Sequence, residues 1–223
     1  MATKLIVSYD GTDNDRDALA LGRLLARAGA SVALAYVRHQ QAPGGREALA
    51  EHEAEALLER GAEWLGDPDV RRFVVLSPST PDGLKELAVK EEAQGIVFGS
   101  AYRTTPGHVY PQQSAERLME GGPLAIALAP AGFVDNGAGG AITSVAAIDE
   151  EGDSSAAETA ASLAAKLGAA VEERPSPGAG LLVVGSKAAA APGTVLVSAA
   201  SAYLVELSRS PTLVVPRGMP LSF

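Results

Sequence analysis

Residues 95–100 read Gly-Ile-Val-Phe-Gly-Ser, and residues 181–186 read Leu-Leu-Val-Val-Gly-Ser. Each stretch is a short apolar run that ends in a Gly-Ser pair, which is typical of a buried parallel strand entering a glycine turn. Gly99 and Gly185 are 86 residues apart, and so are Pro130 and Pro216, each of which ends the next apolar run. This constant offset predicts an internal repeat of one structural unit.

The first copy alternates strand-like and helix-like segments. Apolar runs of strand length at 4–10, 31–37, 70–76, 95–100 and 124–129 are separated by segments with helical spacing at about 13–28, 45–65, 79–93 and 114–120. Asp13, Asn14 and Asp15 offer caps for the first helix. Strict alternation of this kind predicts an α/β fold with a parallel five-stranded sheet, helices on both faces and the Rossmann-like order 3-2-1-4-5.

The second copy is shorter than the first. Residues 142–149 repeat the first strand and end in Asp149, which follows Asp10 by 139 residues, whereas the later elements are offset by only 86, a difference of 53 residues. The missing length corresponds to the second and third strands and their helices, which form one edge of such a sheet. Residues 169–172 are the candidate for a remnant of the second strand, which the second copy either keeps there or has lost.

This count predicts three parts: a complete repeat over 1–131, a linker over 132–141 rich in glycine, and a truncated repeat over 142–223. The last strand of each copy would otherwise leave an unpaired edge. We therefore expect 124–129 to pair with 212–216, so that the two repeats form an intramolecular pseudo-dimer.

Composition excludes several classes of function. The chain has 18 Lys and Arg against 27 Asp and Glu, a net charge of −9 without a basic footprint for nucleic acid. It has no cysteine, which excludes thiol nucleophiles, cysteine zinc sites and iron–sulfur clusters, and its three histidines show no metal-ligand spacing. The absence of a signal-peptide pattern and of a 20-residue apolar stretch predicts a cytoplasmic protein without a membrane partner.

Taken in order, the motifs resemble the universal stress proteins in their tandem form. The resemblance rests on residues 6–12 (Ile-Val-Ser-Tyr-Asp-Gly-Thr), on Gly99-Ser100 followed by residues 114–118 and 124–130, and on the repetition of these pieces in the second copy. The family implies a small α/β fold that pairs through its last strand, a role in stress physiology and, in many members, an ATP site. That site uses Gly, two residues, Gly, nine residues, Gly and then Ser or Thr.

This chain departs from the ATP motif in both copies. In the first, Gly99 is present, but Tyr102 and Gln112 replace the other two glycines and Gln113 replaces the hydroxyl residue. In the second, Gly185 is followed by Ala188, Ser198 and Ala199. Side chains at these positions would crowd the path of the phosphates, for which glycine lets the backbone approach closely. We therefore expect ATP binding to be weak or lost in the first copy and absent from the second.

The candidate nucleotide site lies in the first repeat. The resemblance assigns the adenosine to an acid after the first strand and to backbone of the second, and the phosphates to the glycine turn and the next helix. The positions are Asp10, Gly11, Val37, Gly99, Ser100, Arg103, Gln112, Gln113 and Ser114. Asp10 has the alternative role of fixing a turn with Gly11. Arg103 and His108 either hold a phosphate or belong to a solvated loop. Tyr102 and Tyr110 either stack on a ligand or fill the crevice, and we predict that they fill it.

Three functions follow from this sequence. The first is a regulatory or scaffold protein of the stress response with a degenerate adenine-nucleotide pocket, no certain cofactor, and an unknown protein or small molecule as partner. The second is a protein that binds ATP or AMP through a variant loop in the first repeat. The third is a small hydrolase that uses the crevice at the carboxyl ends of the strands. The chain has no P-loop, no Gly-x-Ser-x-Gly and no His-Glu-x-x-His motif, which favours a protein that is not an enzyme.

Overall fold

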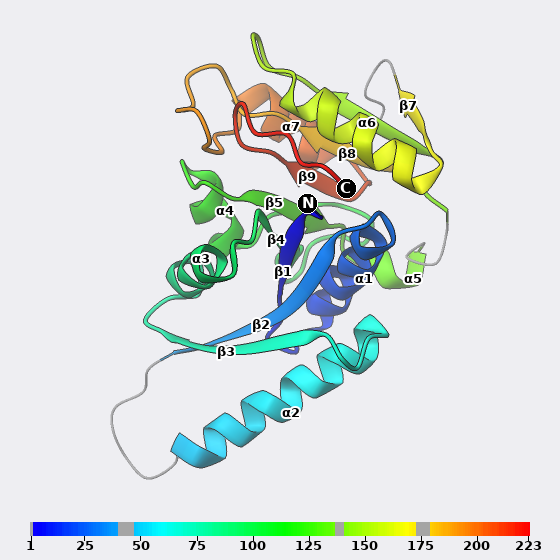
Figure 1. Ribbon diagram of the computed structural model, residues 1–223. Coiled ribbons are helices and arrows are strands. Elements are labelled where there is room, and N and C mark those ends of the chain that lie inside the picture. The colour runs from blue at the N-terminus through cyan, green and yellow to red at the C-terminus, as the bar shows by residue number, and fades with distance from the viewer. Residues whose placement is uncertain (1, 40–46, 137–140, 173–178) are drawn as a thin grey trace.

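A computed structural model describes residues 2–39, 47–136, 141–172 and 179–223 (Figure 1). The strands are β1 (Lys4–Ser8), β2 (Ser31–His39), β3 (Arg71–Ser77), β4 (Gly95–Gly99), β5 (Ala125–Ala129), β6 (Ser144–Ile148), β7 (Ala170–Glu172), β8 (Leu181–Val184) and β9 (Thr212–Val214). The helices are α1 (Asp13–Arg27), α2 (Glu47–Leu65), α3 (Thr80–Glu91), α4 (Gln113–Met119), α5 (Phe133–Asn136), α6 (Ser155–Leu167) and α7 (Ala199–Leu207).

All the described strands belong to one sheet, in the order β3-β2-β1-β4-β5-β9-β8-β6-β7. The first five neighbours pair in parallel, so the predicted order 3-2-1-4-5 of the first repeat is confirmed. Their side chains form near-continuous apolar runs because helices cover both faces of the sheet.

The two repeats join through their last strands. β5 and β9 are antiparallel, with Ile126 opposite Val214, Ala127 opposite Leu213 and Leu128 opposite Thr212. The register is symmetric about the pair of Ala127 and Leu213. Residue 126 pairs with residue 214, the counterpart of residue 128, and residue 128 pairs with residue 212, the counterpart of residue 126. The predicted pseudo-dimer is therefore confirmed, and its twofold axis passes between these two strands.

The second repeat keeps the strands that a shortened sheet needs. β6 lies between β8 and β7, and β7 pairs in parallel with it from Ser144 opposite Ala170 to Ala146 opposite Glu172. The candidate remnant of the second strand at 169–172 is thus present as a three-residue edge strand. Helix α7 follows β8 at the place where the 86-residue offset puts the counterpart of α4.

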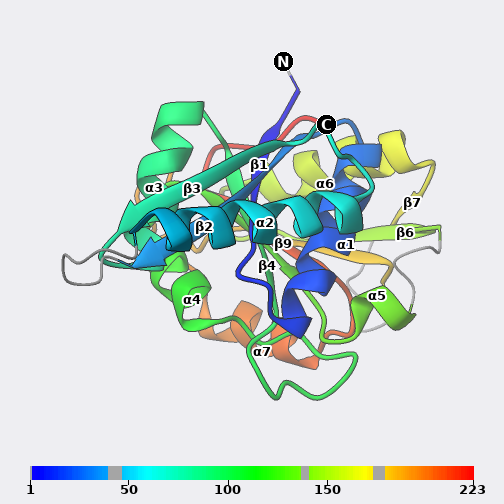
Figure 2. The same ribbon diagram turned by 90° about the horizontal axis from the view of Figure 1, so that it is seen from below.

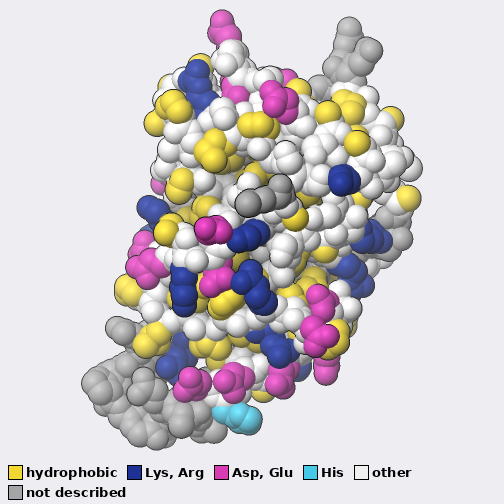
Figure 3. All heavy atoms as spheres, in the orientation of Figure 1, with side chains coloured by type: hydrophobic (Ala, Val, Ile, Leu, Met, Phe, Trp, Pro, Cys, Tyr) yellow, Lys and Arg dark blue, Asp and Glu magenta, His cyan; other side chains and the backbone are white. Residues whose placement is uncertain are grey.

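The helices form one layer on each face of the sheet (Figures 1 and 2). α1, α2 and α6 pack on one face, where their leucines and alanines join a core with Val7, Val97 and Val183. α3, α4 and α7 pack on the other face, against Ile96, Phe98 and Val184. The outer side of α2 carries exposed glutamates, visible as a row of acidic side chains along the lower edge in Figure 3, which agrees with a solvated helix face.

Helical structure begins within the stretch that we expected to be only a linker. The N–H groups of Gly132 and Val134, at the start of α5, donate to the buried carboxylate of Asp17 on α1, each at 2.8 Å. Burial raises the pKa of Asp17, and the N–H donors oppose that rise. Asp17 therefore ties the start of the connection between the repeats to the first core, and residues 137–140 lie outside the described part of the chain.

In the described part of the chain, no helix combines the length and the apolar character needed to cross a membrane.

Candidate functional site

The site is built where the sheet changes the direction of its connections. β1 and β4 are neighbours, but α1 leaves the carboxyl end of β1 toward one face and α4 follows β4 on the other. Open α/β sheets place their ligands in the crevice at such a point. Asp10 and Gly11 follow β1 and Gly99 ends β4, so the structure brings these predicted residues to one crevice, with Ser100 next in the chain.

Asp10 is exposed, and its carboxylate accepts a hydrogen bond from the N–H of Thr12 at 3.2 Å. Gly11 between them has φ +84°, and a Cβ there would lie 2.5 Å from Cδ1 of Leu57 on α2. The left-handed backbone favours glycine at this turn, and a larger residue would also require the end of the Leu57 side chain to move. The role of Asp10 in fixing the turn is therefore present in the structure, and its carboxylate still faces solvent.

Asp15 is the buried partner of this turn. Its Oδ2 accepts the N–H of Asp10 at 2.8 Å and that of Thr12 at 3.1 Å. Thr12 is the N-cap of α1, so the expectation that the cap would be one of residues 13–15 is wrong by one residue. Asp15 instead takes the third position of the helix, where a carboxylate satisfies free N–H groups of the first turn.

Burial raises the pKa of Asp15 to about 8, and a hydrogen bond and charge repulsion from Asp10 add to the rise. The two N–H donors oppose it without offsetting it. At neutral pH the protonated form of Asp15 is therefore favoured, and the crevice carries less negative charge than its two carboxyl groups suggest. Burial also raises the pKa of the neighbouring Tyr9, with a contribution from Asp15.

Gly99 is required by the protein's own packing. A Cβ at this position would clash with the backbone carbonyl oxygen of Asn14, in the first turn of α1. The side-chain amide of Asn14 then donates to the carbonyl of Ser100 at 2.7 Å. The family resemblance explains this glycine by the approach of a phosphate, whereas the structure shows that the approach of α1 already demands it.

The end of the motif is also engaged internally. Gln112 Nε2 donates to the carbonyl of Gly99 at 3.0 Å, across the mouth of the loop. Gln112 is the N-cap of α4, Gln113 is its exposed first residue and Ser114 is half-buried behind it. These three predicted residues thus border the crevice, with the glutamine side chain spanning part of it.

Ser100 holds the loop in shape. Its buried hydroxyl donates to the carbonyl of Ala129 at 2.7 Å and accepts the N–H of Tyr110 at 3.2 Å. Backbone N–H groups that could otherwise face an anion donate within the protein, namely those of Ala101, Thr104, Gly107, His108 and Tyr110. These backbone N–H groups of the loop from Ser100 to Tyr110 therefore bond within the protein and do not point to an anion site.

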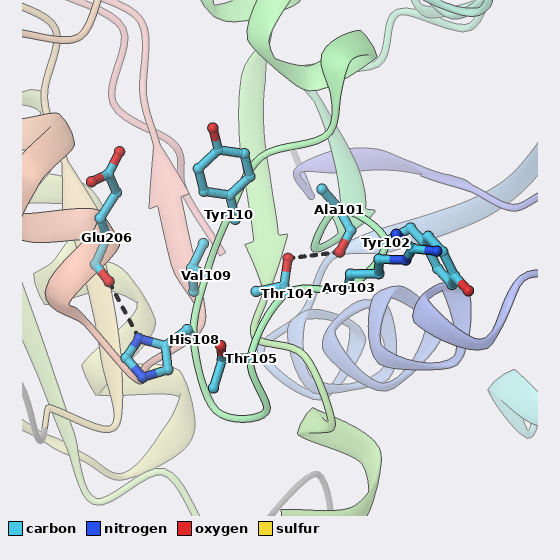
Figure 4. Close-up of a pocket in the computed structure, with 9 residues that line it drawn as sticks. All are labelled: Ala101, Tyr102, Arg103, Thr104, Thr105, His108, Val109, Tyr110 and Glu206. Carbon is cyan, nitrogen blue, oxygen red and sulfur yellow. Dashed lines mark hydrogen bonds between the residues drawn. The ribbon is translucent and has the colours of Figure 1, made fainter.

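The remaining predicted residues do not converge. Val37 is buried against Gly83 of α3, on the far side of β1 from Ser100. Arg103 has a left-handed backbone (φ +68°) and lies over the ring of Tyr102, with its Cζ 5.2 Å from the ring centroid. His108 points the other way, toward the carbonyl of Glu206 on α7 (Figure 4). The structure thus does not bring Arg103 and His108 together around one phosphate.

The two tyrosines do not fill the crevice. Tyr102 is 83% exposed and Tyr110 is 50% exposed, so the prediction that they fill it is wrong. Both lie on a loop whose buried anchors are Ser100 and Val109, and the rings project outward from it. With other residues of this loop and Glu206 they line a shallow pocket of about 420 Å³ between the two repeats (Figure 4).

The second repeat closes its crevice with a carboxylate. Glu150, just after β6, accepts a hydrogen bond from the hydroxyl of Ser201 in the first turn of α7 at 2.8 Å. Asp149, the counterpart of Asp10, accepts the N–H of Ala157 on α6 at 2.9 Å, and Ser198 caps α7. Negative charge therefore stands where a phosphate would meet the Gly-Ser turn and the next helix.

Sequence reasoning missed Asn14, Glu150 and the buried role of Asp15. The spacing of Thr12 and Asp15 follows the capping pattern, which is the one signal that could have identified Asp15. Neither Asn14 nor Glu150 belongs to a local motif, because their partners are 86 and 51 residues away. Among the described residues, no cluster of His, Asp and Glu side chains could hold a metal ion.

Comparison with known proteins identifies the fold. No protein-family model matches the chain, and neither does any curated protein. A universal stress protein from Archaeoglobus fulgidus has a similar structure (TM-score 0.69, 14% identity), covering 96% of this chain and 98% of its own. A putative universal stress protein from Pseudomonas aeruginosa (TM-score 0.58, 12% identity) covers 96% and 93%, and a functionally unknown protein from the same organism (TM-score 0.60, 12% identity) covers 97% and 93%. Over nearly its whole length, the chain therefore has the fold of a universal stress protein.

Proposed function

We propose that this protein is a regulatory or scaffold protein of the universal stress type, in which the adenine-nucleotide pocket has degenerated. In this proposal it binds ATP weakly or not at all, has no catalytic activity of its own, and acts in the cytoplasm through a protein or small-molecule partner. The fold supports the stress-protein class, and the site geometry supports the loss of nucleotide binding.

The observation that carries the proposal is the internal use of the crevice at β4. The amides of Asn14 and Gln112 bond to the carbonyls of Ser100 and Gly99, and the backbone of Asn14 occupies the space beside the Gly99 Cα. A triphosphate would have to displace these contacts without a gain from the two absent glycines. Binding energy would then be spent on rearranging the loop.

A second candidate function is the binding of ATP or AMP by the first repeat. The observation in its favour is the exposed carboxylate of Asp10 next to the ends of β1 and β4, since an acid at this place can bond a ribose hydroxyl. The adenosine half of the pocket would then remain while the phosphate half does not. AMP, which needs less of the phosphate half, would then lose less affinity than ATP.

Calorimetry with ATP, AMP and cyclic AMP tests both candidates. We expect the native protein to bind ATP with a Kd above about 1 mM, which corresponds to about 4 kcal/mol. The triple variant Tyr102→Gly, Gln112→Gly, Gln113→Ser restores the motif in the first repeat, and we expect it to bind ATP at least about tenfold more tightly.

The second repeat supplies the matched control. Ala188→Gly, Ser198→Gly and Ala199→Ser restore the same motif there, and we expect no gain because the Glu150 carboxylate occupies the crevice. Micromolar ATP binding by the native protein that Asp10→Ala abolishes would overturn the proposal in favour of the second candidate. Steady phosphate release from ATP by the purified protein would contradict the absence of catalysis.

A further inference from the structure

Helix α7 is apolar on the side that faces solvent. Of its nine residues, Ser201 and Val205 are buried. Its exposed residues include Tyr203, Leu204 and Leu207, which are 61%, 42% and 48% exposed. Apolar surface that gathers on one element in this way is typical of a place where another molecule binds, whereas apolar residues scattered singly are not.

The first repeat shows that the fold does not require this apolar surface. With the 86-residue offset, Glu116 and Arg117 of α4 correspond to Ala202 and Tyr203 of α7, and both helices pack on the same face of the sheet. Glu116 and Arg117 are exposed, as charged residues on the outer side of a surface helix usually are. The second repeat therefore carries apolar residues at positions that do not contribute to its own core.

Tyr203 also lacks the cover that two other exposed aromatic rings have. Arg16 lies over the ring of Trp64, with its Cζ 3.8 Å from the ring centroid, and Arg103 lies over Tyr102 at 5.2 Å. Across the part of the chain that the structure describes, no cation lies over the ring of Tyr203 in this way. The ring is therefore available to a partner.

Two charges of opposite sign border the apolar residues. Glu206 is exposed in the last turn of α7, and Arg209 is exposed just beyond the end of the helix. Ser208 and Ser210 are both buried, so the side chain of Arg209 between them points outward, as alternate residues of an extended segment do. Among the described residues, neither Glu206 nor Arg209 has a salt-bridge partner.

We propose that this outer surface of α7 binds the same surface of a second copy of the chain, around a twofold axis. The axis passes beside Leu207, so that the leucine of one copy lies against that of the other. Glu206 and Arg209 stand on either side of Leu207 in the chain, so the axis brings Glu206 of each copy toward Arg209 of the other. An apolar centre bordered by both signs of charge is complementary to itself, as a twofold dimer requires.

The pocket beside α7 enlarges the same surface. It has a volume of about 420 Å³, and Tyr110 of the first repeat and Glu206 of the second both line it. Figure 4 shows the side chains of Tyr110 and Glu206 extending from their two segments toward the same side. Tyr110 is 50% exposed, so its ring adds an aromatic side chain of the first repeat to the proposed interface.

This dimer differs from the pairing that already exists within the chain. The last strands of the two repeats pair with each other and are not available to a second copy. The α7 surface lies outside that pairing, and its use does not depend on whether a nucleotide binds. A second copy is thus a partner that the proposed function does not include.

The size of the surface predicts a weak and reversible dimer. A few half-exposed side chains offer less area than the roughly 1,200–2,000 Å² that stable interfaces bury, and a net charge of −9 makes two copies repel each other. We expect a Kd of about 100 μM, measured by sedimentation velocity over a range of protein concentrations. A native chain that stays monomeric at about 1 mM would overturn the proposal.

Tyr203→Arg tests the apolar centre. It introduces the residue type that α4 carries at the equivalent position 117, so we expect an unchanged circular dichroism spectrum and a dimer that is at least about tenfold weaker. Val89→Arg is the matched control, because Val89 is 73% exposed on α3, which lies apart from α7 in Figures 1 and 2. The control should leave the Kd unchanged. Equal effects of the two substitutions, or no effect of Tyr203→Arg, would contradict the proposal.

An exchange of charges tests the twofold arrangement. Glu206→Arg and Arg209→Glu each place like charges across the axis, so each variant alone should dimerise at least about tenfold more weakly than the native chain. Mixed in equal amounts, the two variants place opposite charges at both contacts, and we expect the mixture to dimerise about as tightly as the native chain. A mixture as weak as its components, or a single variant that dimerises like the native chain, would show that another surface is used and would overturn the proposal.

Discussion

The loops after β4 and β8 share one hydrogen-bond framework and differ in what surrounds it. The hydroxyls of Ser100 and Ser186 donate to the carbonyls of Ala129 and Val215, the residues before Pro130 and Pro216, at 2.7 and 2.8 Å. Each hydroxyl also accepts an N–H at 3.2 Å. Gly99, however, is pressed against the backbone of α1, whereas a Cβ at Gly185 would meet its nearest atom at an ordinary 3.4 Å. The serine of the Gly-Ser motif thus has the same role in both loops, whereas the glycine has a different role in each.

The closing of each crevice shows the same divergence. In the first repeat neutral amides span the ends of the strands, and in the second a carboxylate does so. In the first repeat, where the closing groups are neutral, substitutions could restore a nucleotide site. In the second repeat the carboxylate repels phosphate even when space is made. Under the proposed function, the two copies of one site would have lost the same ligand by different physical means.

The largest expected difference between the two loops comes from replacing each glycine by alanine. Gly99→Ala forces α1 away from the sheet, and we expect a loss of about 3 kcal/mol in the free energy of unfolding. Gly185→Ala adds a methyl where there is room, and we expect a change within about 0.5 kcal/mol. Chemical denaturation of both variants measures the difference, and equal losses would break the proposed contrast between the two loops.

The next effect concerns Asp15, which the second repeat does not reproduce. Its pKa is raised in the folded state, so folding favours the protonated form, and this stabilisation is present at low pH and is lost as pH rises toward about 8. Asparagine keeps the acceptor oxygen and an N–H donor toward Asp10. We therefore expect Asp15→Asn to be more stable than the native protein at pH 8 by about 2 kcal/mol, because at that pH the native protein begins to bury a charged carboxylate where the variant buries a neutral amide.

The difference between Asp15→Asn and the native protein should shrink from pH 8 to pH 5. Denaturation curves at several pH values would measure it, with Asp13→Asn, an exposed acid of the same turn, as the control. A difference that stays constant with pH, or that grows as pH falls, would show that Asp15 is ionised in the folded protein.

The smallest expected effect concerns the serine hydroxyl that the two loops share. Ser100→Ala and Ser186→Ala each remove one hydroxyl that both donates and accepts, and we expect each to cost about 1.5 kcal/mol of unfolding free energy. Because both serines are fully buried and have equivalent partners, the two losses should agree within about 0.5 kcal/mol. Thermal or chemical denaturation checks this, and a loss confined to Ser100 would point to a role beyond the shared framework.

Local patterns were enough for the elements and their order. Apolar runs of strand length, the 86-residue offset and the shortened interval after Asp149 predicted the sheet order, the truncated repeat and the pairing of the last strands. The reason is that burial between two helix layers imposes continuous apolar strands, and an unpaired last strand demands a partner. The same patterns could not show that Tyr102 and Tyr110 face outward, because exposure of a loop residue depends on which side of the loop rests on the core.

The sequence by itself determined the repeated α/β architecture and the absence of the full ATP motif, since both are written in residue types at fixed spacing. Only the tertiary structure decided why Gly99 must be glycine and how each crevice is closed. Those features depend on atoms that lie far apart along the chain and meet only when helices dock on the sheet. Their energies come from contact distance and burial, neither of which is encoded at any single position.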